Sequence, residues 1–499
     1  MANYYGGSGN DLVLAWADNR PFAWGANDLG NLGDNTTTNR FLPVPVTATG
    51  VLAGRTVVAL AGGYYLSVAL CADGTVAAWS DNRYGQLGNS TTNSSLVPVA
   101  VNTAAGMSAL YGKTVVAISA GRNHSLALCS DGTVAAWGNN DYGQIGDNTT
   151  TSRDVPVAVN TAPGISVLSN KTVVAIAAGS LHSLALCSDG TVAAWGWNGW
   201  GQIGDNTTTQ RNVPVAVNTA SGSALHGKTV QAIAAGAHHN LALCWDGTVV
   251  AWGYNNSGQL GDNTYTQRNA PVAVNTNSDV SALYGKTVLA IAAGTYHSLA
   301  LSSDGSALSW GNNRLGQLGD NTTTQRSVPV AVTTNSGISA LYGKTLVGIA
   351  AGAWHNLALC DGTVAAWGLN AAGQLGDNIT ESQHNAPVAV TTTPLAVGQR
   401  FARVASGSTA NQTLALVAAP PASQIKLTGA QTLTNGSFQF TFTNTAGAFF
   451  GVLVTTNPAL PLSNWTPLDG LTEVTPGQFQ FTDAQATNSP QRFYRVRSP

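Results

Sequence analysis

Charged residues are scarce in this chain. Lysine, arginine, aspartate and glutamate make up 9% of its 499 residues, against roughly 25% in typical soluble proteins. The formal net charge is −2 and no run of basic residues occurs. We therefore expect no nucleic-acid partner, because that affinity comes mainly from Lys and Arg displacing counterions. The same shortage argues against an electrostatic membrane patch.

Long apolar runs are also missing, so we expect no membrane-spanning helix. The first residues, Met1 to Gly7, have neither the charged region nor the apolar core of a secretion signal. We expect a secreted or cell-surface protein whose signal is not part of this sequence, with a cytoplasmic location as the alternative.

Recognisable catalytic motifs are absent. Glutamate occurs only at Glu381 and Glu473, and there is no nucleophile elbow, zinc-binding helix or phosphate loop. We expect no catalytic residues and no cofactor. The alternative is an enzyme acting on polysaccharides, in which the fold brings two distant aspartates together.

The strongest feature that is present is an internal repeat of about 57 residues, which is typical of a modular architecture. Ala-Trp-Gly, or a close variant, recurs at intervals of 55 to 58 residues. The tryptophans are Trp24, Trp79, Trp137, Trp195, Trp252, Trp310 and Trp367.

Each repeat predicts three or four short strands. An Asp-Gly pair between two apolar runs is a strong hairpin signal, and a proline restricts the last run to a sheet edge or a strand start. In one repeat the expected strands are Thr172–Ala177, Ser183–Cys187, Thr191–Trp195 and Val213–Val217, with Asp189-Gly190 as the turn and Pro214 in the last run. Such units close into a ring of blades.

The repeat resembles the regulator-of-chromosome-condensation family. The shared features are an AGxxHSLAL strand, the DG turn, the WG pair and a GQLGD segment, which recur in register from about Gly6 to Leu416. The resemblance implies a seven-bladed β-propeller of bacterial type.

The expected fold class is all-β, with the propeller at 1–417, a linker at 418–423 and a small β-sandwich at 424–499. Gly7–Leu14 and Val404–Leu416 look like extra copies of the AGxxHSLAL strand. We expect Phe401–Leu416 to complete the blade that contains Trp24. In the tail, expected strands of an immunoglobulin or fibronectin type are Gln424–Thr428, Ser437–Thr443, Gly451–Thr455, Gln478–Thr482 and Arg492–Arg497.

Several polar residues repeat once per blade, which favours structural roles. For the histidines we expect bonds to the backbone of their own blade, with an axial metal ring as the alternative. The cysteines should be free, buried thiols. The Asp-Gly and Gly-Asp-Asn aspartates should form turns and cap loops, with calcium as the alternative. The histidines are His124, His182, His239, His297 and His355, and the cysteines are Cys71, Cys129, Cys187, Cys244 and Cys360.

Two windows vary most between copies, one before the histidine and one after Trp-Gly. Antiparallel strands should place both windows on one rim, opposite the Asp-Gly turns. Aromatic residues and Arg are the side chains that protein hot spots use, although packing between blades is the alternative. The candidate rim residues are Tyr64, Tyr65, Tyr84, Arg122, Tyr142, Trp197, Trp200, His238, Tyr254, Tyr296, Arg314 and Trp354.

These features predict a monomeric, non-catalytic binding protein that recognises a protein, or alternatively a glycan, at its rim. In mode it is similar to bacterial propellers of this family that inhibit β-lactamases. The family's eukaryotic activity, guanine-nucleotide exchange on a small GTPase, is a further alternative that the missing basic tail does not favour.

Overall fold

The computed structural model describes residues 19–418 and, in the C-terminal part, 428–432, 437–443, 451–455, 466–468, 471–475, 478–483 and 493–497. The chain divides into two units, Met1–Ala418 and Ala419–Pro499. The expectation of an all-β protein is confirmed. Apart from one short 3-10 turn, η1 (Gly50–Leu52), all regular elements in the described residues are strands. No helix in the described ranges has the length and hydropathy needed to cross a bilayer.

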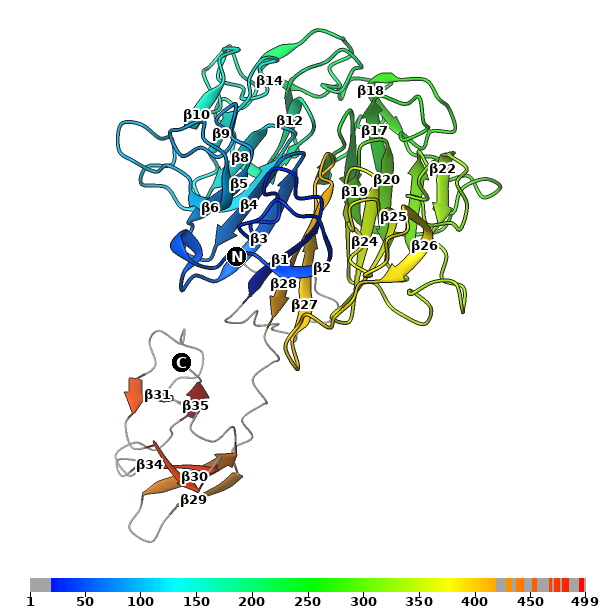
Figure 1. The fold of residues 1–499 in the computed structure, drawn as a ribbon. Helices are drawn as coiled ribbons and strands as arrows, with labels where there is room; N and C mark the ends of the chain where they lie inside the picture. The colour runs from blue at the N-terminus through cyan, green and yellow to red at the C-terminus, as the bar shows by residue number, and fades with distance from the viewer. Residues whose placement is uncertain are drawn as a thin grey trace. The chain divides into compact units, whose positions relative to one another are not determined.

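Four-stranded antiparallel sheets repeat along the first unit (Figure 1). Their strands pair in sequence order, so each sheet is an up-and-down meander. Six of the seven sheets described in this unit run continuously. They are β3–β6 (Val57–Gly63, Leu66–Cys71, Val76–Ser80, Ser95–Ala100), β7–β10 (Val115–Ala120, His124–Cys129, Val134–Gly138, Arg153–Ala158), β11–β14 (Val173–Ala178, His182–Cys187, Val192–Gly196, Arg211–Ala216), β15–β18 (Val230–Ala235, His239–Cys244, Val249–Gly253, Arg268–Ala273), β19–β22 (Val288–Ala293, His297–Ser302, Ala307–Gly311, Arg326–Ala331) and β23–β26 (Gly348–Ala351, His355–Cys360, Thr363–Leu369, Gln383–Ala389).

The remaining sheet joins the two ends of the unit. It contains β2 (Arg40–Pro45), β1 (Arg20–Gly25), β28 (Gln412–Ala418) and β27 (Arg400–Ala405), in that order. The expectation that Phe401–Leu416 completes the blade of Trp24 is confirmed, because Trp24 pairs with Thr413. Figure 1 shows β1 and β28 side by side. The suggested copy at Gly7–Leu14 lies outside the described residues.

The strand predictions within a repeat are confirmed to within a few residues. The second and third strands are buried along their whole length. The fourth strand lies at the sheet edge, as Pro214 requires. Its pairing with β13 is interrupted between Ala194 and Gly196, and Pro214 lies in that irregular stretch.

Neighbouring sheets are joined through the repeated tryptophans, all of which are fully buried. The indole Nε1 of Trp195 donates to the carbonyl of Gln144 in the preceding sheet at 2.9 Å. A Cβ at Gly146 would lie 2.7 Å from that same Nε1, so glycine is required where the ring rests. The bond from Trp24 to the Gln374 carbonyl makes the same connection between the last sheet and the first.

The second unit contains two sheets in its described part. One orders β29 (Thr428–Thr432), β30 (Phe438–Thr443), β34 (Gln478–Asp483) and β33 (Leu471–Thr475), and the other β32 (Thr466–Leu468), β31 (Gly451–Thr455) and β35 (Phe493–Arg497). The expected strands near β30, β31, β34 and β35 are confirmed, whereas β32 and β33 were missed. Most of the expected strand Gln424–Thr428 and residues 419–423 of the linker lie outside the described residues.

Candidate functional site: an aromatic rim

The two ends of each hairpin form different surfaces, which we call the rim and the turn face. In one sheet, Leu186 pairs with Val192 beside the Asp-Gly turn, and His182 pairs with Gly196 at the opposite end. The rim comprises the loop between the first and second strands of each sheet and the loop after the third strand. The turn face comprises the Asp-Gly turns. All twelve candidate rim residues lie in the rim loops, and each is half-buried or exposed.

Seven of these side chains form a continuous series of ring contacts. The central contacts join Trp197 to Trp200 at 4.6 Å, Trp200 to Tyr254 at 4.5 Å and Tyr254 to Tyr296 at 5.6 Å between ring centroids. His238 contacts four rings of the series. We call this series the aromatic ladder: Tyr142, Trp197, Trp200, His238, Tyr254, Tyr296 and Trp354.

The other aromatic candidates lie apart from the ladder. Tyr64 and Tyr65 contact each other at 4.2 Å, and the guanidinium of Arg122 lies over the Tyr64 ring at 5.0 Å. The Tyr64 hydroxyl, with burial, raises the pKa of Tyr65 to about 12. Tyr84 is 39% exposed, and no ring contact to it is found among the described residues. The sequence predicted that all of these residues share the rim loops, but it did not separate the ladder from the other aromatic residues.

A pocket of about 600 Å³ opens at one end of the ladder. Three rings, Tyr254, Tyr296 and Trp354, line it together with the exposed Arg314. The remaining lining groups are neutral, and most carry an amide or hydroxyl. This volume lies within the range of roughly 300–1,000 Å³ that ligand pockets occupy.

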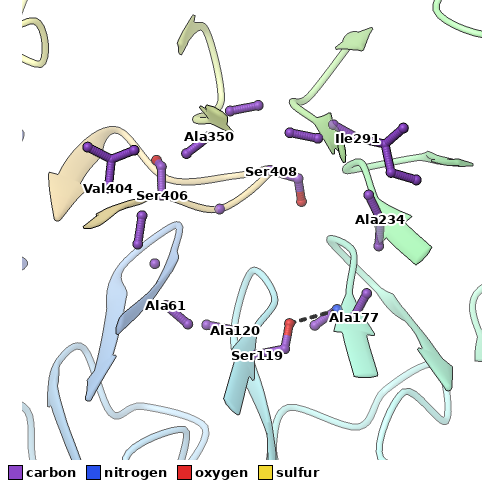
Figure 2. Close-up of a pocket in the computed structure, with 18 residues that line it drawn as sticks. Ala61, Ser119, Ala120, Ala177, Ala234, Ile291, Ala350, Val404, Ser406 and Ser408 are labelled. Atoms are coloured by element: carbon purple, nitrogen blue, oxygen red, sulfur yellow. Dashed lines mark hydrogen bonds between the residues drawn. The ribbon is translucent and has the colours of Figure 1, made fainter. Parts of the chain in front are cut away.

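A second, smaller cavity of about 290 Å³ lies among the inner strands of all seven sheets (Figure 2). It is lined mostly by alanine, and none of its lining residues is charged. The loop between β27 and β28, Ser406–Asn411, crosses this cavity with Ser406 and Ser408 on it (Figure 2).

This crossing loop is held by loops of other sheets. Thr295 Oγ1 donates to the Ser408 carbonyl at 2.8 Å, and the Ala353 amide donates to the Ala410 carbonyl at 2.8 Å. At Gly407 a Cβ would lie 1.7 Å from the Gly62 carbonyl oxygen, so only glycine allows this approach. The loop has three more residues than Gly179–Leu181, its counterpart between β11 and β12.

The repeated histidines lie beneath the rim and join successive sheets. Each is completely buried, and its Nε2 contacts a side chain about 58 residues further on. His124 contacts Ser183 Oγ at 3.0 Å, and His182 contacts Asn240 Oδ1 at 2.8 Å. The structural role is confirmed, but the expected partner was wrong, because the imidazole contacts the next sheet and not the backbone of its own.

The contact of His124 requires a proton on Nε2, and burial keeps the imidazole neutral. Ser183 gives its only hydroxyl proton to the Gln144 carbonyl, so His124 must donate from Nε2, and Nδ1 is left without a partner. Burial lowers the pKa of His124 to about 3 and that of His182 to about 4. In the closing sheet, Gln412 replaces histidine and donates through Nε2 to carbonyls of the β3–β4 turn.

The remaining repeated groups serve the fold. The five cysteines are free and buried as expected, and burial raises the pKa of Cys71, Cys187, Cys244 and Cys360 to about 11. Asp189 Oδ1 accepts the Thr191 amide, and Asp205 Oδ1 accepts the Thr207 amide. Within the described part of the chain, no three His, Cys, Asp or Glu side chains converge as a metal site requires.

Sequence reasoning missed a buried asparagine in the rim loop that follows the third strand of each sheet. The amide of Asn198 donates to the carbonyls of Thr207 and Thr209, while its Oδ1 accepts the Ile203 amide at 2.9 Å. This side chain therefore fixes the loop that carries Trp197 and Trp200. Its recurrence two residues after every Trp-Gly pair, or Trp-Ser at Trp79, was the available signal.

Comparison with known proteins places the fold among established propellers. Residues 5–344 match the model of the RCC1-like domain, and residues 361–414 match the regulator of chromosome condensation (RCC1) repeat. The ultraviolet-B receptor UVR8 of Arabidopsis thaliana is 29% identical over 356 residues, covering 71% of this chain and 74% of UVR8. The human E3 ubiquitin-protein ligase HERC2 is 33% identical over 392 residues, 78% of this chain but 7% of HERC2.

Solved structures agree with this result. Human WBSCR16 superposes with a TM-score of 0.66 at 26% identity, covering 81% of this chain and 100% of WBSCR16. Prp20p of Saccharomyces cerevisiae, studied for its binding to Gsp1p and histones, superposes with a TM-score of 0.67 at 23% identity, covering 81% of this chain and 93% of Prp20p. The latter similarity establishes the fold alone.

Proposed function

This chain belongs to the regulator of chromosome condensation family through its RCC1-like domain, and from that premise we propose that it is a non-catalytic protein that binds a protein partner on its aromatic rim. The observation that carries the proposal is the aromatic ladder: seven contacting rings that are half-buried or exposed. Rings serving only to pack neighbouring sheets would be covered completely, as the seven repeated tryptophans are. Contiguous exposed aromatic surface is typical of interaction sites.

The finer architecture belongs to the same proposal. We take the seven sheets to be blades of one closed wheel, supported by the tryptophan bonds that link each sheet to the next and the last to the first. We take the strands after residue 424 to form a small sandwich of the immunoglobulin or fibronectin type. A secreted or cell-surface location and a monomeric state complete this hypothesis.

Exchange activity on a small GTPase is less well supported. Prp20p is similar in fold at 23% identity, which carries no activity to this chain, and most of the candidate rim residues in the described loops are uncharged. A glycan partner is the other candidate, because aromatic faces stack on sugars as well as on protein side chains.

The test compares two sets of tryptophans on opposite surfaces. Affinity capture from the native host should recover a protein with the unaltered chain and lose it with Trp200→Ala combined with Trp354→Ala. The expected loss of affinity is about hundredfold, since buried aromatic anchors contribute 2 kcal/mol or more. Trp245→Ala, which removes a 70% exposed tryptophan from the turn face, is the matched control.

Binding to the captured protein should then be measured with purified components. Thermal unfolding of each variant shows whether the fold is kept. Equal retention of the partner by the double variant, or equal loss with Trp245→Ala, would contradict the proposal.

A further inference from the structure

The pocket at the end of the ladder contains one cationic side chain, Arg314. Arg314 is exposed in the rim loop after β21, and no ion pair to it is found among the described residues. Asn312, two residues earlier, accepts the Arg314 amide through Oδ1 but offers no charge to the guanidinium. None of the residues lining the pocket is an aspartate or glutamate.

In another rim loop, the arginine at the same position forms an ion pair with a carboxylate. Arg83 occupies the same loop position in the sheet β3–β6, and there the residue two positions earlier is Asp81. Arg83 Nε lies 3.0 and 3.1 Å from the two Asp81 oxygens, and Nη2 lies 3.1 Å from Oδ2. The loop that holds Arg314 thus keeps the arginine and lacks the carboxylate.

The two loops share several other hydrogen bonds. The different surroundings of Arg83 and Arg314 therefore follow from the residue two positions earlier, which is Asp81 in one loop and Asn312 in the other. Gln86 Nε2 donates to Asp81 Oδ2 at 3.2 Å, and Gln317 Nε2 donates to Asn312 Oδ1 at 3.0 Å. In both loops the next residue is a buried asparagine, Asn82 or Asn313. The guanidinium of Arg314 therefore remains available at a pocket that three rings line.

We propose that this pocket holds an aspartate or glutamate side chain from an extended segment of the protein partner. The carboxylate pairs with Arg314, and the flanking apolar side chains of that segment lie on Tyr254, Tyr296 and Trp354. The inference rests on the proposed function and specifies the chemistry of the partner. A planar guanidinium binds a carboxylate through two parallel hydrogen bonds, which gives direction as well as energy.

The charge of the pocket favours a carboxylate over a phosphorylated segment. Phosphate recognition in proteins uses clusters of arginines, whereas this pocket has one cation among neutral groups. A single guanidinium matches the single charge of an acidic side chain. The three rings match the apolar neighbours that an extended peptide presents on one side.

The test is a selection of peptides displayed at the N-terminus of a phage coat protein, so that no free C-terminal carboxylate is present. The full chain should enrich peptides in which Asp or Glu lies next to aliphatic or aromatic residues. Asn312→Asp should abolish that acidic preference, because it supplies Arg314 with the internal partner that Asp81 gives Arg83. Affinity for a selected acidic peptide should fall about tenfold to hundredfold.

The controls separate this inference from the proposed function. Asp81→Asn makes the reverse change in the other loop and should leave the acidic preference intact, and Arg314→Gln should remove it. Enrichment of apolar peptides without acidic residues, or equal acidic enrichment on Asn312→Asp, would overturn the carboxylate site while rim binding stands. Peptides that still bind after Trp200→Ala with Trp354→Ala would overturn rim binding itself.

Two further probes complete the experiment. Inorganic phosphate and the neutral sugar cellohexaose are titrated against the selected acidic peptide. Neither should displace it at millimolar concentration. Displacement by phosphate on the unaltered chain but not on Arg314→Gln, or binding of cellohexaose with no peptide enriched, would overturn the assignment in favour of the other ligand.

Discussion

The rim and the turn face are opposite ends of the same hairpins, yet they use their side chains differently. On the turn face, one cation in each of several repeats pairs with the Asp-Gly aspartate, as Lys171 does with Asp189 and Lys228 with Asp246. On the rim, the residues at matching positions differ from sheet to sheet and contact one another across sheets. Residues that are the same in most copies stabilise the hairpin. Residues that differ between copies form the pocket and the aromatic ladder.

Exposed aromatic residues alone do not distinguish these surfaces. Tyr111, Tyr284 and Tyr342 share one repeat position beside the turn-face lysines and are each more than 60% exposed. Among the described residues, no ring contacts them, whereas the ladder rings form a connected series. Continuity of the aromatic surface is therefore the feature that marks the rim as a candidate interface.

Low pH should give the largest difference in stability between the rim and the turn face. The five buried histidines beneath the rim have folded-state pKa values of about 3 to 4, below the unfolded value of about 6.5. The unfolded chain therefore binds more protons, and stability that is complete above pH 6.5 is lost as pH falls. At pH 5 each histidine should cost about 2 kcal/mol, or about 10 kcal/mol together.

The turn-face pairs should survive that treatment, because Lys171 holds the pKa of Asp189 at about 2. Urea unfolding between pH 8 and pH 5 measures the loss. Replacing His124 and His182 by Gln, the residue that stands at position 412, should reduce the pH dependence, since glutamine does not titrate. An unchanged pH dependence in that variant would show that the histidines are not its source.

The next largest effect should come from substituting aspartates, and it should differ between a rim loop and the turn face. Asp205 is 9% exposed and accepts bonds from Thr207, Asn198 and Arg211. Asp189 is 49% exposed. Asp205→Ala should lower the free energy of unfolding by about 3 kcal/mol, because it leaves a half-buried arginine without its partner. Asp189→Ala should cost less than about 1 kcal/mol.

Urea unfolding at pH 8 distinguishes these outcomes, and partner binding should fall only for Asp205→Ala, whose loop supports Trp200. Equal destabilisation by the two substitutions would mean that the hydrogen bonds of the rim loops contribute no more than those of the exposed turns.

Salt should have the smallest effect. Raising NaCl from about 50 mM to about 500 mM shortens the screening length and should lower the free energy of unfolding by less than about 1 kcal/mol. We expect the loss to come from the exposed turn-face pairs. Changing Lys113, Lys171, Lys228 and Lys286 to Met should therefore remove most of the salt dependence, which thermal unfolding at both salt concentrations would show. A salt response that persists in that variant would place its source among the rim-loop pairs.

Much of this molecule could be predicted from the periodicity of its sequence. The Asp-Gly turn and the two flanking apolar runs predicted the hairpin, and the hairpin predicted that both variable windows share one surface. The partners of the histidines could not be predicted, because Ser183 and Asn240 lie one repeat away from the histidines they contact. Which rings join the ladder depends on how adjacent sheets pack, and a single repeat carries no information about that.

Some of what was missed had a signal in the sequence. The loop Ser406–Asn411 has three residues more than Gly179–Leu181, its counterpart between β11 and β12, and this insertion predicts a departure from the repeated turn. The pair Asn312 and Arg314, set beside Asp81 and Arg83, shows that Arg314 lacks the carboxylate neighbour that Arg83 has. Both signals appear when the copies are compared position by position.

The sheet that joins the two ends of the unit cannot form until the last strands of the unit have been synthesised. β1 and β2 leave the ribosome before the other described strands of this unit, but β1 pairs with β28, which lies nearly 400 residues later. At roughly 5–20 residues per second, that interval lasts on the order of 20–80 s. During it the edge of β1 that later pairs with β28 lacks that strand, and an unpaired edge can pair with another chain. Among the described strands of the unit, β1 is therefore made first and paired with β28 last. The yield of folded protein should depend on what shields the β28-facing edge of β1 until β28 is made.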